Sequence, residues 1–147
     1  MALQHRNTRD EQMIFFAERY NQNLKLLARD LIKRYPNDPK IYRAEKRVMF
    51  IIAVEPLAVI ECSGPYLYQY REQIYDTDNM TSFFLQAEFD SDLNASVDTE
   101  KADMAAYIIP KAKECMRTLD PETLEVYKEL VINLLDDYIE YVDKKRS

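Results

Sequence analysis

The chain has 147 residues, of which 47% are apolar and 31% charged, and it carries a formal net charge of −6. This length suits one domain with one core, and the composition excludes a disordered or low-complexity chain. The single glycine, Gly64, excludes the phosphate-binding loop, the dinucleotide-binding fingerprint and the nucleophile elbow, all of which need several glycines.

Apolar periodicity predicts a first helix from about Asp10 to Tyr35. Its apolar stripe repeats at spacings of three and four and consists of Met13, Ala17, Tyr20, Leu24, Leu27 and Leu31. We expect residues 1–9 to form a flexible arm, since terminal residues are often poorly ordered. After the prolines that end this helix, Asp38 is predicted to cap a second helix, with Pro39 in its first position.

The second helix is predicted over residues 39–62 and is apolar on nearly every side in its middle. Such a helix is usually surrounded by others, so we expect residues 41–60 to be central in the fold. Pro56 predicts a kink or a break. We interpret Gly64 as the residue with positive φ that ends the helix, followed by Pro65, which blocks continuation.

Further helices are predicted over residues 65–75, over 78–89, and from about residue 98 with an interruption at Pro110. The last begins at Asp120 and Pro121, a capping carboxylate followed by a first-turn proline, and runs to a frayed end at 143–147. The sequence therefore predicts a single all-α domain over residues 1–147, an irregular bundle of five or six helices.

Catalytic and metal-binding residues are not indicated. The only histidine, His5, lies near the end of the chain, so neither Cys62 nor Cys115 has an obvious base, and we interpret both cysteines as small core residues. Zinc-type and di-iron-type ligand patterns are absent from the sequence, so no catalytic residue, metal or cofactor is predicted. No secretory signal or membrane-length apolar run is found, which predicts an intracellular protein, cytoplasmic or nuclear, and not a secreted one.

The loop from Asp90 to Lys101 partly matches a calcium-binding loop, with oxygen-bearing residues at alternate positions. Ala95 replaces the glycine that allows the sharp turn, and Lys101 replaces the bidentate glutamate. We therefore interpret it as an acidic loop that leads into a helix cap, and weak calcium binding is the alternative hypothesis.

Charge is distributed unevenly along the chain. Residues 1–47 carry 11 Lys and Arg against 6 Asp and Glu, whereas residues 48–147 carry 9 against 20. The basic residues are concentrated in one segment that is either a solvated helix face or an anion-binding patch: Lys25, Arg29, Lys33, Arg34, Lys40, Arg43, Lys46 and Arg47. A third hypothesis is that the basic part of one copy binds the acidic part of another copy or of a partner.

Aromatic residues cluster in a second segment, which is either core with hydroxyl groups at its rim or a protein interface. The candidate interface residues are Tyr66, Tyr68, Tyr70, Arg71 and Tyr75.

Three stretches together give a family resemblance: residues 26–38, then Ser82 to Leu85 followed by Phe89 to Leu93, then Ile108 to Lys111 leading to Tyr127 to Val131. Their order resembles small helical proteins encoded by nucleocytoplasmic large DNA viruses of the phycodnavirus and mimivirus group. The resemblance implies a helical protein of unassigned function, without catalytic residues and with a virion-associated role in some members.

These observations predict a non-enzymatic protein-interaction or structural module, a viral virion-associated or host-interaction factor by resemblance, which binds a protein partner or itself. The alternative is a nucleic-acid-associated factor that uses the basic segment from Lys25 to Arg47.

Overall fold

The computed structural model of the chain describes residues 2–86 and 110–146. All regular structure in these two ranges is helical, which confirms the predicted all-α class and the single helical bundle. The loop from Asp90 to Lys101 lies outside the described residues.

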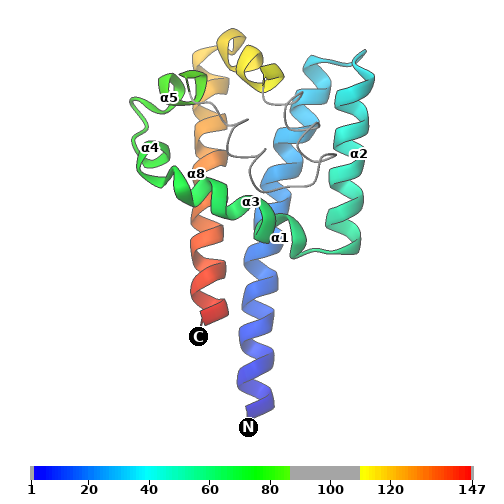
Figure 1. Cartoon of the computed structure of the whole chain (residues 1–147), viewed down its shortest axis with the longest axis vertical. Coiled ribbons are helices and arrows are strands. Elements are labelled where there is room, and N and C mark those ends of the chain that lie inside the picture. Colours follow the sequence, from blue (N-terminus) through cyan, green and yellow to red (C-terminus); the bar gives the residue numbers. More distant parts are fainter. Residues whose placement is uncertain (1, 87–109, 147) are drawn as a thin grey trace.

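The two longest helices, α1 (Ala2–Arg34) and α8 (Pro121–Arg146), form the antiparallel centre of the bundle (Figure 1). Their contact buries Ala17 and Tyr20 of α1 against Leu134 and Tyr141 of α8, and Ile60 completes this core cluster. Residues 2–9, expected as an arm, belong to α1, and residues 143–146, expected to fray, belong to α8. The periodic apolar stripes of both helices therefore face each other, as amphipathic helices require.

Helix α2 (Pro39–Val54) begins as predicted. Asp38 Oδ1 accepts hydrogen bonds from the backbone N–H groups of Lys40 and Ile41, at 3.0 and 3.2 Å. The helix ends before Glu55, which confirms a break at Pro56, and Asn21 Nδ2 donates to the Pro56 carbonyl at 2.9 Å.

The expectation that α2 is the central helix is wrong. One face of α2 packs inward, but the side chains of Phe50 and Val54 on the other face are 67% and 60% exposed. The apolar middle of this helix therefore combines a core face with an unburied apolar face, which a composition argument cannot separate.

Helix α3 (Ala58–Gln69) continues through Gly64 and Pro65, where the sequence predicted a helix end. Gly64 is buried inside this helix and its φ is not positive, so the predicted left-handed cap is also wrong. Its role is close packing: a Cβ at this position would lie 2.6 Å from Cγ of Tyr138 on α8.

Two short helices, α4 (Arg71–Tyr75) and α5 (Met80–Gln86), pack on the other side of α8, so the predicted helix over 65–75 is divided. Ile74 and Met80 are buried there with Leu135, in a second core cluster.

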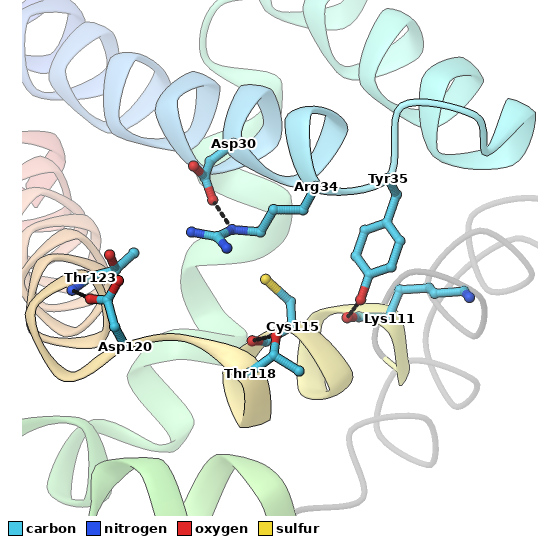
Figure 2. A network of polar contacts seen from close by, with 8 residues as sticks. All are labelled: Asp30, Arg34, Tyr35, Lys111, Cys115, Thr118, Asp120 and Thr123. Atoms are coloured by element: carbon cyan, nitrogen blue, oxygen red, sulfur yellow. Dashed lines mark hydrogen bonds and ion pairs between the residues drawn. The ribbon is translucent and has the colours of Figure 1, made fainter.

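A helix over residues 110–118 precedes α8 in the chain and packs near the end of α1. In Figure 2, the Tyr35 hydroxyl points to the Lys111 carbonyl, with 3.5 Å between the oxygens, and Arg34 Nε donates to Asp30 at 2.8 Å. Asp120 Oδ1 accepts from the Thr123 backbone N–H at 2.7 Å, which confirms the predicted cap of α8.

Candidate functional site

The outward side of α2 combines apolar and cationic side chains. We call this surface the basic face; its residues are Lys40, Tyr42, Arg43, Lys46, Phe50 and Val54, all exposed. Steps of three and four residues place them on one side of the helix, opposite the buried Ile41, Ala44 and Ile52. This face therefore exposes large apolar groups that its own fold leaves unpacked.

No acidic side chain lies on the basic face. Between residues 38 and 54 the only acids are Asp38, which caps the helix, and Glu45, whose side chain turns inward and is 10% exposed. Lys46 Nζ lies 5.2 Å from the centre of the Tyr42 ring, a cation–π contact at the surface. The basic face thus presents three cationic side chains beside its apolar groups.

The predicted basic segment extends over two helices in the structure. Arg29, Lys33, Arg34, Lys40, Arg43 and Lys46 are exposed, whereas Lys25 and Arg47 are half-buried. Arg34 is paired with Asp30, and this hydrogen bond raises the pKa of the guanidinium further. Of the predicted patch, Lys40, Arg43 and Lys46 belong to the basic face.

A second exposed surface has the opposite charge. We call it the acidic face; it follows the outward side of α8 and consists of Glu122, Glu125, Val126, Glu129, Asn133, Asp136 and Glu140. Val126 is 52% exposed among these carboxylates. The only cation from Pro121 to Asp143 is Lys128, which is half-buried and bonds to Glu125 and to the Thr77 carbonyl.

The two faces belong to different helices. Figure 1 shows α1 between α2 and α8, and both of these helices contact α1 and α3. One copy therefore presents a basic apolar helix face in one direction and an acidic apolar helix face in another.

The candidate tyrosine residues do not form one patch. Tyr70 packs in the second core cluster, and the Tyr75 hydroxyl donates to Asp136 Oδ1 at 2.5 Å; burial and this carboxylate raise the pKa of Tyr75 to about 12. Tyr68 and Arg71 remain exposed at the surface, stacked on each other with the guanidinium carbon 4.4 Å from the ring centre, and Tyr66 is half-buried.

A protein-bound metal ion needs several ligating side chains close together. Residues 8–85 and 110–146 hold no group of three or more side chains placed to bind a metal ion. Cys115 is buried as predicted, but Cys62 is exposed, so the interpretation of Cys62 as a core residue is wrong.

No single helix in the described ranges has the length and apolar character needed to cross a membrane. Helices α2 and α3 have that length and apolar character only when they are taken together, and the chain bends by 115° at the break between them.

The sequence contained part of the signal for these faces. The acidic character of residues 48–147 was evident, whereas Phe50 and Val54 belong to the segment 41–60 that was expected to be central. Placing α2 on a helical wheel separates the buried arc from the cationic arc, and that pattern could have indicated the basic face.

Comparison with known proteins adds no relationship: no family model, curated protein or solved structure matches this chain.

Proposed function

We propose that the chain is a non-enzymatic structural module that self-associates, with the basic face of one copy on the acidic face of the next. The exposed Phe50, set among cations on a helix whose opposite side is packed, is the observation that carries this proposal. Large apolar side chains with an aromatic member and a charged rim are typical of protein interfaces.

A second copy offers the basic face both opposite charge and an apolar contact. Its acidic face supplies carboxylates for Lys40, Arg43 and Lys46, and Val126 supplies an exposed apolar group among the glutamates at the start of α8. Complementary charge fixes orientation and speeds encounter, while burial of the apolar groups adds affinity.

The contact would be head-to-tail because the two faces differ and belong to two helices that lie on either side of α1. Heterologous contacts of this kind form rings when the rotation closes and open filaments when it does not. Such assembly agrees with the structural, virion-associated role that the resemblance to large DNA virus proteins implies.

Nucleic acid is the competing partner, because the basic segment could also contact phosphates. Two observations favour protein: Phe50 and Val54 gain nothing from a phosphate backbone, and the whole chain carries a net charge of −6, which opposes a polyanion.

The test is the molar mass of the purified chain, measured by light scattering over a range of protein and salt concentrations. We expect oligomers that dissociate as salt rises, since the charge contribution is screened. Phe50→Ser should shift the chain to monomer, whereas the control Phe15→Ser, which alters a 52% exposed phenylalanine on α1 outside both faces, should not. A chain that stays monomeric and binds duplex DNA with a steep salt dependence would replace this proposal with the nucleic-acid one.

A further inference from the structure

A cavity of about 680 Å³ lies behind α2, on the side opposite the basic face. Residues of α1, α2, α3, α5, the helix over 110–118 and α8 line it, and most are apolar, among them Leu27, Val48, Ile51, Met116 and Val131. Its volume falls in the range of roughly 300–1,000 Å³ that is typical of small-molecule sites.

One polar group in this wall lacks a hydrogen-bond partner. The side chain of Glu45 lines the cavity and is 10% exposed, and its Oε2 is buried without a hydrogen bond. The ammonium of Lys46 lies 4.0 Å from this oxygen, beyond hydrogen-bond distance, on a side chain that is 61% exposed. Buried carboxylate oxygens normally accept hydrogen bonds, so Glu45 is an acceptor available to a ligand.

Three other polar side chains of the wall, those of Ser63, Lys128 and Arg47, already have partners. Ser63 Oγ donates to the Val59 carbonyl and bonds to the Tyr20 hydroxyl, both at 2.6 Å. Lys128 bonds to Glu125 and to the Thr77 carbonyl, and Arg47 also has an interaction partner. Among the described residues of the wall, Glu45 alone has a buried side-chain oxygen without a hydrogen bond, so we take this carboxylate as the group that selects the head group of a ligand.

We propose that this cavity binds an amphiphilic primary amine, with the apolar body along the wall and the ammonium group on Glu45. An ammonium group supplies a donor and a charge opposite to the carboxylate, and hydrogen bonds of this kind are short and strong. The apolar body replaces water along the side chains of α1, α2 and α8.

The test compares decylamine, decanol and decanoate, which share one chain and differ in the head group, by calorimetric titration of the full chain below micelle formation. We expect one decylamine per chain, bound at least tenfold more tightly than decanoate, with decanol between them. Glu45→Gln should remove the preference for the amine. Glu55→Gln, which changes an exposed carboxylate that also lines the cavity, should leave the preference unchanged.

A cavity-filling variant tests the location. Ala28→Phe places a ring in the cavity wall and should abolish binding of both decylamine and decanol, with circular dichroism confirming that the helices remain. Absence of saturable binding, tighter binding of decanoate, or an amine preference that survives Glu45→Gln would each overturn the proposal. Because the basic face lies on the other side of α2, these outcomes are independent of the assembly test.

Discussion

The ring of Tyr138 lies directly against the backbone of Gly64, so that a Cβ on Gly64 would stand 2.6 Å from Tyr138 Cγ. In an open helix, replacing glycine by alanine is expected to stabilise by about 1 kcal/mol. Here the added methyl group must displace a half-buried ring in a packed core. We expect Gly64→Ala to reduce the free energy of unfolding by about 1–3 kcal/mol, measured by urea denaturation.

The matched control removes the ring of Tyr138. In a Tyr138→Ala background, Gly64→Ala should cost nothing or become stabilising, because the methyl group then enters free space. If Gly64→Ala stabilises the natural chain, the close approach of α3 to α8 is not as described.

This contact also shows what the sequence could not predict about α3. Glycine followed by proline is a local signal for a helix end, and local propensity supports that interpretation. Burial of Ile60 and Gly64 against α1 and α8 overrides it, so the helix continues through Pro65. By contrast, Asp38, Asp120 and Pro56 act within one turn of the chain, and their effects were predicted correctly.

Asp137 is a buried acid in the contact between α1 and α8. It is 3% exposed, its Oδ2 has no hydrogen-bond partner, and Arg19 Nε lies 3.5 Å from Oδ1. Burial raises the pKa of Asp137 above its usual value, and Arg19 opposes this only in part. The folded chain therefore holds this proton to a higher pH than the unfolded chain does.

The contribution of Asp137 to stability should consequently fall as pH rises from about 4, the ordinary pKa, through the raised value, and the penalty is complete above it. We expect Asp137→Asn to raise the free energy of unfolding at pH 7 by about 1 kcal/mol and to have little effect near pH 4. Urea denaturation of both chains at several pH values measures the difference. A destabilised Asp137→Asn at pH 7 would mean that the pair with Arg19 outweighs burial.

Glu61 joins α3 to the end of α8. Its Oε1 accepts hydrogen bonds from the Tyr141 hydroxyl at 2.6 Å and from Lys145 Nζ at 3.0 Å, and these bonds, the tyrosine first, lower the pKa of Glu61. We expect Tyr141→Phe to cost about 1 kcal/mol, because the lost bond reaches an ionised acceptor. Lys145→Met, which removes a half-exposed partner, should cost less than about 1 kcal/mol.

The pH dependence of Glu61 is opposite to that of Asp137. A lowered native pKa contributes stability above the ordinary value of about 4.3 and loses it as pH falls through the native value. The cost of Tyr141→Phe should therefore shrink in acid; an equal cost at pH 7 and pH 3 would show that the carboxylate charge is not involved.

Asn21 on α1 is hydrogen-bonded to the turn between α2 and α3. It is 3% exposed, and its Nδ2 donates to the Pro56 carbonyl at 2.9 Å. We expect Asn21→Ala to cost about 1–3 kcal/mol, since the carbonyl loses its donor and a small space is left. Gln22→Ala, one residue along on the exposed side, should stay within about 0.5 kcal/mol in the same thermal unfolding measurement.

Of the two faces, only the charge could be predicted from the sequence. The acidic second part of the chain and the basic residues near Arg43 and Lys46 are evident in the sequence, and a contact between copies was one of the hypotheses. Which apolar residues stay exposed was not evident, because Phe50 and Ile52 stand in the same apolar run, and only the packing of α2 on the other helices makes Ile52 the buried one. The cavity beside Glu45 likewise depends on six segments that meet in space.

Charge reversal tests the proposed assembly most directly. One variant carries Arg43→Glu and Lys46→Glu, so both of its faces are acidic. Another carries Glu122→Lys, Glu125→Lys and Glu129→Lys, which leave only Asp136 and Glu140 as acids on its α8 face, so both of its faces carry net positive charge. Sedimentation velocity should find each variant monomeric alone, because like charges meet, and should find an equimolar mixture assembled, because each face again meets its opposite. Oligomers of either variant alone, or a mixture that stays monomeric while the natural chain assembles, would contradict the contact between the basic face and the acidic face.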